Sequence, residues 1–137
     1  MRYIIAVVVA VTWTAVGAPV AAHHSFAAEF DDSKCSDITG TLTSLDWQNP
    51  HAYFYMERKD ASGTPQKLQM QTSSLANMIR GGTPRQYFME NMGKAVTVRA
   101  CASHTTANRY AASWIRGGDG EVHRVGQDVE RIFGSNN

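Results

Sequence analysis

The chain has 137 residues and carries 13 Lys and Arg against 12 Asp and Glu. Its first 22 residues differ from the rest, because 17 of them are apolar and their only charge is Arg2. The remaining 115 residues are formally neutral, and about 37 % of them are apolar. This composition fits one small domain with a modest core. It excludes a disordered polyelectrolyte and lacks the basic excess that is typical of nucleic-acid binding.

Residues 1–22 have the pattern of an export signal. A positive start is followed by the apolar segment 3–15, a Gly and Pro break, and small residues that suit cleavage after Ala22. An uncleaved anchor is the alternative, since the segment is just long enough to span a bilayer. The break and the small residues favour cleavage. We therefore predict a periplasmic or secreted protein without a membrane anchor, with one domain at 23–126 and a polar tail at 127–137.

Cleavage after Ala22 would give the mature chain the start HHSF, residues 23–26. An N-terminal His23 can offer its free α-amine and its ring Nδ1 to one metal ion as a chelate, and His24 adds a second ring. Imidazole nitrogen suits copper, zinc and nickel, and Cu(II) binds such sites most tightly among these divalent ions. The alternative is a solvated chain end, which is the usual state of termini.

Cys35 and Cys101 are the only cysteines. An exported chain meets an oxidising compartment, where an even pair usually forms a disulfide. Two free, buried thiols are the alternative. We predict the disulfide, which would close a loop of nearly seventy residues.

The pattern of residue types predicts three strands in the first part of the domain, at residues 36–47, 51–59 and 66–72. Gly40 favours a bend or bulge in the first strand, and residues 60–63 are typical of a hairpin turn. In the second and third strands, alternation places these side chains inward: Ala52, Phe54, Met56, Leu68 and Met70.

The period then changes to that of short helices. Ser73 or Ser74 can cap a helix that ends at Arg80, with Leu75, Met78 and Ile79 on its apolar side. A second short helix follows Pro84 and ends at Gly93. Alternation returns in three further predicted strands, at residues 94–101, 109–116 and 121–125.

The predicted order is three strands, a helical segment and two or three more strands. This order is typical of a mainly β, OB-like, five- to six-stranded Greek-key barrel. A split α+β sheet is the alternative. In an OB-like barrel the first and fourth strands pair antiparallel. Cys35 would precede the first strand and Cys101 would end the fourth, so the predicted disulfide and the predicted barrel support each other.

Three short segments make the chain similar to a known family, and the HHSF and NPH motifs are the specific part of the resemblance. The segments HHSF (residues 23–26), EFD (29–31) and WQNPH (47–51) resemble a family of short exported bacterial proteins classed as a domain of unknown function. Its members typically open the mature chain with HHSF and carry W-x-N-P-H after the first strand. The resemblance extends over most of the mature chain, including residues 96–98, and implies export and a shared fold rather than an activity.

The chain departs from this family pattern at two positions. Cys35 stands where the family often has Pro, which makes the disulfide particular to this chain. Gly82 stands where a Trp often follows Gly, within the helical segment.

The resemblance draws attention to His23, His24 and His51 as candidate metal ligands. If the N-terminal arm folds over the mouth of the first hairpin, the amine and ring of His23 and the ring of His51 make a three-nitrogen copper site. His24 would be a substitute or fourth ligand, and an imidazole-only site could equally hold zinc. The alternative for His51 is a turn histidine that bonds backbone groups near Asn49.

Ligand histidines are often oriented by a hydrogen-bond acceptor behind them. Asp46 and Asn49 are candidates for this role near His51, as are Asp31 and Asp32 near the arm, although such residues are more often solvated turn groups. The other two histidines of the domain, His104 and His123, are expected at the surface without a partner at ligand spacing.

These observations favour an exported barrel that binds copper. We expect a binding or delivery role rather than catalysis, because no acid–base pair, nucleophile or phosphate-binding loop can be assigned. The alternative is a non-metal module that binds a partner protein or a sugar on an aromatic face formed by Trp47, Tyr53, Tyr55 and Trp114. These four side chains could instead belong partly to the core. A small oxidative copper enzyme is a third possibility.

Overall fold

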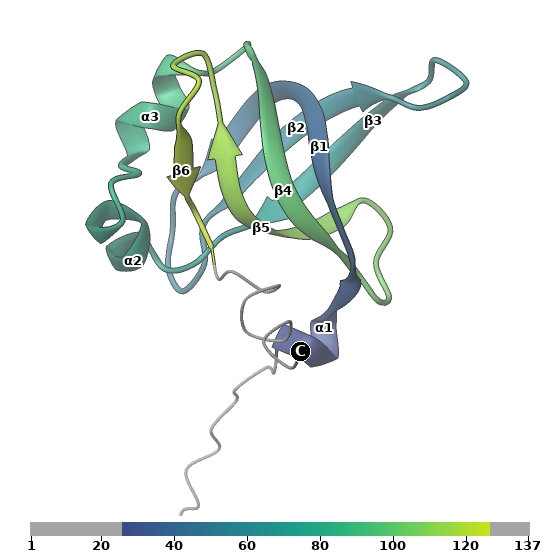
Figure 1. The fold of residues 1–137 in the computed structure, drawn as a ribbon, viewed down its shortest axis with the longest axis horizontal. Coiled ribbons are helices and arrows are strands. Elements are labelled where there is room, and N and C mark those ends of the chain that lie inside the picture. The colour runs from purple at the N-terminus through teal and green to yellow at the C-terminus, as the bar shows by residue number, and fades with distance from the viewer. Residues whose placement is uncertain (1–25, 127–137) are drawn as a thin grey trace, which may run out of the picture.

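The computed structural model describes residues 26–126. The predicted export signal, His23, His24 and the predicted tail at residues 127–137 lie outside the described residues. The elements, labelled in Figure 1, are α1 (Phe26–Glu29), β1 (Phe30–Asp46), β2 (Tyr53–Lys59), β3 (Pro65–Gln71), α2 (Leu75–Arg80), α3 (Arg85–Glu90), β4 (Ala95–Ser103), β5 (Arg109–Arg116) and β6 (Val122–Arg124).

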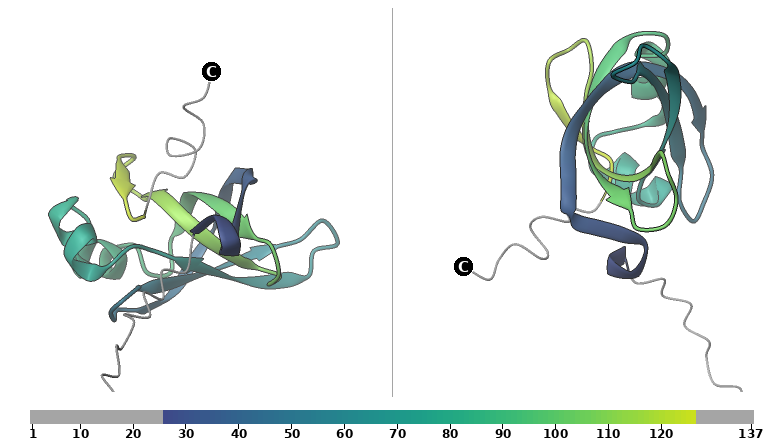
Figure 2. Two further views of the ribbon diagram at one scale, coloured as in Figure 1. Left: turned by 90° about the horizontal axis from the view of Figure 1, so that it is seen from below. Right: turned by 90° about the vertical axis from the view of Figure 1, so that its right-hand side faces the viewer.

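The strands form one sheet that closes on itself. Their order is β3-β2-β1-β4-β5-β6, and a parallel pairing of β3 with β5 closes the first five into a barrel. The right-hand view of Figure 2 looks into this ring of strands. The predicted OB-like barrel, with short helices between its third and fourth strands, is therefore confirmed, and β6 is an extra strand paired antiparallel with β5. The closing pair rules out the split-sheet alternative.

The barrel interior follows the alternation predicted from the sequence. The inward side chains of β2 and β3 are fully buried, and so are Val98 on β4 and Ile115 on β5. Phe88 of α3 enters the same cluster, with its ring centroid 5.4 Å from that of Phe54. Since α2 contributes Met78 to this core as well, the two helices cover one end of the barrel.

One residue of the helical segment does not lie where the pattern placed it. Ile79 was predicted on the apolar side of α2, but it is 56 % exposed. Leu75 and Met78, three residues apart, face the core, and the next residue is turned away by about 100° of helical rotation. The predicted cap is correct, because the Ser74 hydroxyl accepts a hydrogen bond from the Asn77 amide, and Gly82 adopts a positive φ of 85° just after the helix.

The first strand is longer than predicted, because β1 already begins at Phe30. Its pairing with β2 shifts between Leu42 and Ser44 rather than at Gly40, where the prediction placed a bend or bulge. Gly40 pairs regularly with Val96, and its role is a close approach: a Cβ there would lie 2.7 Å from the Glu57 carbonyl oxygen. The missing side chain thus lets the backbone of β2 pass over β1.

Replacing Gly40 with Ala is expected to destabilise the barrel by about 1 to 3 kcal/mol, since backbone rather than a flexible side chain must move to accept the new methyl group. Urea unfolding of Gly40→Ala and of Ser36→Ala, an exposed position on the same strand, would measure this cost. Equal stabilities for the two variants would contradict the close-approach argument.

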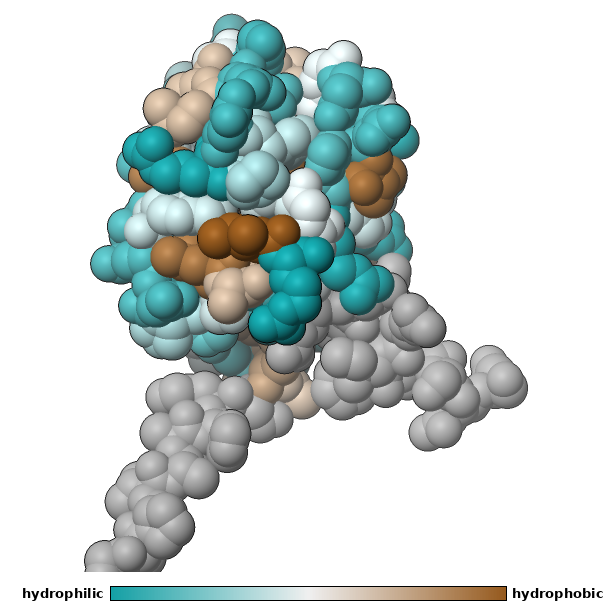
Figure 3. All heavy atoms as spheres, turned by 90° about the vertical axis from the view of Figure 1, so that its left-hand side faces the viewer, coloured by the Kyte–Doolittle hydropathy of each residue, from teal (hydrophilic) through white to brown (hydrophobic). Residues whose placement is uncertain are grey.

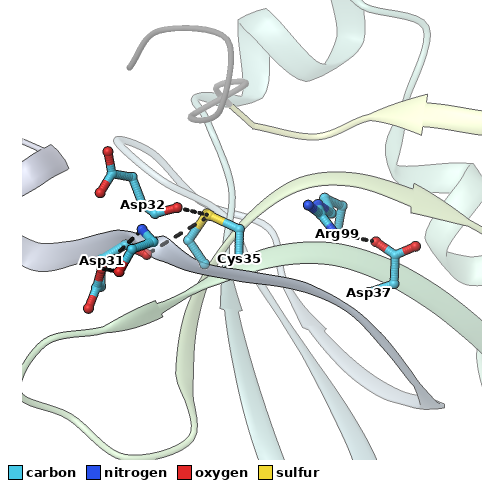
Figure 4. The surroundings of a disulfide bond; sticks show 7 residues. Asp31, Asp32, Cys35, Asp37 and Arg99 are labelled. Atoms are coloured by element: carbon cyan, nitrogen blue, oxygen red, sulfur yellow. Dashed lines mark hydrogen bonds and ion pairs between the residues drawn. A yellow bond between two sulfur atoms is a disulfide. The ribbon is translucent and has the colours of Figure 1, made fainter. Parts of the chain in front are cut away.

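The start of β1 is joined to β4 by the predicted disulfide. Cys35 and Cys101 are direct partners in the antiparallel β1–β4 pair and are bonded to each other, as Figure 4 shows. Cys35 lies inside β1 rather than before it, because the strand continues back to Phe30. Beyond the disulfide the next matched pair is Phe30 with Ser103, so residues 31–34 bulge out of the ladder.

The β1–β4 pair also carries polar contacts on its outer face. The Arg99 guanidinium lies 3.1 Å from the Asp37 carboxylate, directly across the two strands (Figure 4). The hydroxyls of Thr39 and Thr97 are 2.9 Å apart in the next outward pair. Exposed pairs of this kind contribute little individually. The disulfide is therefore expected to be the main constraint where the ladder is interrupted.

Replacing both cysteines with Ser is expected to lower the free energy of unfolding by about 4 kcal/mol, the chain-entropy value for a loop of this length. Denaturant unfolding with and without a reductant would measure the change. The reductant should destabilise the wild type and leave Cys35→Ser/Cys101→Ser unaffected. A wild type insensitive to complete reduction would argue against a stabilising disulfide.

The side of the molecule that carries the helices presents scattered apolar groups. The large apolar side chains that are most exposed are Ile79, Met89 and Val122. Figure 3, which looks at this side, shows a larger brown hydrophobic group near the centre and a smaller one at the right, each surrounded by more hydrophilic residues. Within residues 26–126, no helix combines the length and the apolar character required to cross a bilayer.

Candidate functional site

His51 stands in the loop between β1 and β2, immediately after a cis Asn49–Pro50 peptide bond. Its ring Nδ1 lies 3.0 Å from the Thr72 carbonyl oxygen. A carbonyl can only accept, so Nδ1 carries the proton in the neutral ring and Nε2 keeps its lone pair. The amide and hydroxyl of Thr72 both donate to the Ala52 carbonyl, at 3.0 and 2.9 Å, which fixes the acceptor behind His51.

The exposed ring of His51 lines a cleft of about 280 Å³. Its lining includes Phe26 and Glu29 of α1, Gln71 at the end of β3 with the residues that follow it, and Ala111 and Ala112 of β5. A second hollow continues from it toward Tyr53 and Arg109, and it shares His51, Glu29 and Gln71 with the first. We call the two together the His51 cleft.

Charged and amide groups converge on one wall of the His51 cleft. The Arg109 guanidinium forms an ion pair with the Glu29 carboxylate and donates a hydrogen bond to Gln71 Oε1 at 2.8 Å. The Tyr53 hydroxyl also donates to Gln71 Oε1, at 3.5 Å. Arg109 and Glu29 are both about three-quarters buried, so this ion pair is partly shielded from water. The first turn of the described chain is thus tied to the barrel wall.

His104 contacts the same turn from the loop between β4 and β5. Its backbone amide donates to the Glu29 carbonyl at 3.0 Å, and its Nε2 lies 3.2 Å from the Ala27 carbonyl. Its Nδ1 is 3.9 Å from the carboxylate of Asp31. The Ser33 side chain and then the Lys34 ammonium hold the pKa of Asp31 at about 2, so this carboxylate is charged at neutral pH. His104 therefore lies at the surface, as predicted, and its contacts do not form a metal-holding group within residues 26–126.

The residues predicted to orient His51 have other contacts. Asp46 accepts a hydrogen bond from the Gln48 side chain at 2.8 Å. Asn49 accepts from the Leu75 amide at 3.3 Å, and so connects the loop to the start of α2. The group behind His51 is instead the Thr72 carbonyl. The alternative proposed that His51 bonds to backbone groups near Asn49. His51 does bond to a backbone group, but this acceptor lies 21 residues farther along the chain.

The four aromatic residues of the alternative ligand face do not have a common environment. Trp47 packs against the core, 5.9 Å from the Phe88 ring. Trp114 lies under the guanidinium of Arg116 on β5. Only Tyr53 and Tyr55 lie together on the outer side of β2, where the Lys67 ammonium is 4.5 Å above the Tyr55 ring. The aromatic part of this face is therefore the tyrosine pair.

His123 belongs to a different cluster, at the hairpin between β5 and β6. Its Nε2 lies 2.6 Å from the Asp119 carboxylate, and its ring centroid is 4.0 Å from that of Tyr87. Burial and then the charge of Asp119 raise the pKa of Tyr87 to about 12. His123 was predicted at the surface, but its side chain is only 20 % exposed. Its contacts do not include any residue of the His51 cleft.

Sequence reasoning missed Thr72, Glu29, Gln71 and Arg109 as neighbours of His51. The fold alone could have indicated two of them: in a barrel closed by parallel β3–β5 pairing, Gln69 is the partner of Arg109, and Gln71 lies two residues farther on the same face. The contacts of α1 with His104 and Arg109 have no comparable signal. They depend on where the chain enters the barrel.

The structure tests only part of the predicted metal site. Within residues 26–126, no group of three or more His, Cys, Asp and Glu side chains has an arrangement that could hold a metal ion. His23 and His24 lie outside the described residues, so their placement relative to His51 stays a prediction.

Comparison with protein families identifies the chain at the family level. A model described as a family of unknown function (DUF6152) matches residues 10–112, which include both the HHSF and the WQNPH segments. No curated protein and no solved structure gives a significant match. The predicted resemblance is confirmed, and this small β-barrel protein belongs to the DUF6152 family.

Proposed function

We propose that this protein is exported and binds copper through His23 and His51, in a binding or delivery role. The observation that carries the proposal is the fixed ring of His51 in a cleft that residues of α1 also line. Metal-binding histidines almost always donate their second ring nitrogen to an acceptor, which sets the tautomer and the direction of the ligating nitrogen. The Thr72 carbonyl supplies this acceptor and leaves Nε2 for a metal.

The length of the chain supports His23 as the other source of ligands. Phe26 lines the cleft together with His51, and His23 is three residues before it. Three extended residues span at most about 10 Å, which is comparable with the dimensions of the cleft. Cleavage after Ala22 would place the α-amine and the Nδ1 of His23 on one residue, so both nitrogens would arrive together.

The donor set favours copper over other metals. One amine and two imidazole nitrogens form an all-nitrogen site, for which Cu(II) has the highest affinity in the divalent series. His24 would be the substitute or fourth ligand. If cleavage does not free the amine of His23, an imidazole-only site is left, and zinc becomes an equally suitable occupant.

Two features support export. The apolar start of the sequence has the pattern of a cleaved signal, and a disulfide joins the only two cysteines. Disulfides persist mainly in oxidising compartments such as the periplasm or the cell exterior. A copper-binding role outside the cytoplasm is consistent with both.

The proposal is tested by intact mass of the exported protein and by copper titration against a competing chelator. We expect a chain that begins at His23, binds one copper ion more tightly than micromolar, and loses affinity at least about tenfold in His51→Ala. His123→Ala is the matched control, since it removes a histidine that has no contact with the cleft. A different start together with binding no tighter than micromolar would refute the proposal.

A chain with one extra Gly before His23 separates the amine from the rings. It keeps every imidazole but removes the chelate of amine and Nδ1 on one residue. We expect weaker copper binding and one fewer nitrogen in the electron paramagnetic resonance spectrum. Unchanged affinity and spectrum would point to an imidazole-only site instead.

The second candidate is a non-metal interaction module, and the tyrosine pair on β2 favours it. Tyr53 and Tyr55 are only partly buried on the outer side of the hairpin, beside the amides of Gln69 and Gln71. Aromatic rings flanked by amides suit a sugar or a peptide of a partner protein. Such a partner would still bind His51→Ala, and it would be lost from Tyr53→Ala/Tyr55→Ala.

A further inference from the structure

We infer that Glu29, His104 and Arg109 form a clamp that holds the start of the mature chain at the His51 cleft. We call these three residues the N-terminal clamp. The inference rests on the proposed function and deepens it, since it assigns positioning residues to the proposed site of His23 and His51. None of the three residues is a proposed metal ligand.

The β4–β5 loop contacts α1 through residues at both of its ends. The β4–β5 connection begins after Ser103 and ends at Arg109. At its beginning, His104 bonds the carbonyls of Ala27 and Glu29. At its end, Arg109 pairs with the carboxylate of Glu29. Backbone and side chain of Glu29 are therefore held from two directions.

The loop itself is anchored, so it can act as a fixed support. The Ser103 hydroxyl accepts hydrogen bonds from the amides of Thr105 and Thr106, at 3.3 and 3.2 Å. Ser103 also pairs with Phe30, the first residue of β1. Arg109 is the first residue of β5 and is bound to Gln71 of the neighbouring strand. The loop that holds α1 is therefore itself held by the barrel wall.

Apolar contacts complete the hold on this turn. The ring of Phe26 packs 4.9 Å from that of Phe30, which is itself only 1 % exposed. The Arg109 guanidinium lies 5.8 Å from the Phe30 ring centroid, so one cation contacts both the acidic and the aromatic part of the arm. A four-residue helix is too short to be stable alone. Its geometry must come from these contacts.

Fixing α1 restricts where His23 can go. Phe26 lines the cleft, and His23 precedes it by three residues, which span at most about 10 Å when extended. A short tether from a fixed point raises the local concentration of the donor that it carries. The clamp should therefore strengthen metal binding without contributing a ligand.

The test uses Arg109→Gln, which opens the clamp but removes no metal ligand. Arg116→Gln is the matched control, with the same charge change on the same strand, away from α1. We expect Arg109→Gln to bind copper about tenfold more weakly, with an altered spectrum, while Arg116→Gln behaves as the wild type. Arg109→Lys should recover part of the affinity, because it restores the charge opposite Glu29.

A metal-free measurement keeps this inference separate from the proposed function. The His104 amide donates to the Glu29 carbonyl, so its hydrogen exchange reports release of α1. We expect faster exchange of this amide in metal-free Arg109→Gln, with little change in the core strands. Unchanged exchange would overturn the clamp even if copper binds.

The remaining outcomes are also decisive. Faster exchange together with unchanged copper affinity and spectrum would show that the clamp is structural and does not position a donor. If the wild type binds no copper, the proposed function fails, and the positioning role fails with it. Exchange at His104 then decides whether the clamp holds the arm at all.

Discussion

The antiparallel pairing of β1 with β4 is the constraint on which the other features depend. β1 pairs with β4 from Cys35 to Thr41 and with β2 from Thr41 to Asp46, so one strand belongs to both halves of the barrel. A strand can cross between two neighbours only if it bends and lets them approach. The register shift after Leu42 and the missing side chain of Gly40 meet these two requirements. The disulfide fixes the register at the other end of the same pairing.

The site is a consequence of that closure. Once β1 lies between β2 and β4, the end of β3 reaches the start of β5, and the two pair in parallel. Residues that are far apart in the sequence then meet at one rim: His51 before β2, Gln71 at the end of β3 and Arg109 at the start of β5. Because α1 runs directly into β1, α1 is brought to the same rim.

The sequence predicts well what depends on local pattern. The alternation of apolar side chains around Phe54, Met70 and Val98 defined strands and inward faces correctly, because burial on one face imposes a period of two. The Ser74 cap and the glycines after Arg80 defined α2 for equally local reasons. The cysteine pair supplied a long-range restraint, and with the OB-like strand order it supported the antiparallel pairing of the first and fourth strands.

What the sequence did not predict depends on contacts between distant segments. Nothing near Ile79 distinguishes it from Met78, and only the direction of the core decides which is buried. The acceptor for His51 was sought among its neighbours Asp46 and Asn49, whereas a backbone carbonyl, which no residue type reveals, holds the ring. His104 contacts Ala27, 77 residues before it, and Arg109 pairs with Glu29, about 80 residues before it. The bulge at residues 31–34 separates α1 from the regular part of the β1–β4 ladder.

The division of the proposed copper site between a fixed and a terminal part has a physical advantage for delivery. His51 is held by the barrel, so its ring loses little entropy when a metal binds. The amine and ring of His23 would come from a chain end only three residues beyond its last anchor, where ordering costs more but release is easier. A site assembled wholly from rigid elements would hold copper tightly and exchange it slowly. The proposed site would lie at an open rim and would combine one preoriented ligand with a short tethered chelate. An incoming ligand could then displace the chelate before the bond from His51 to the metal breaks. In this proposal, the clamp between His23 and the barrel would determine how far the chelate could move from His51.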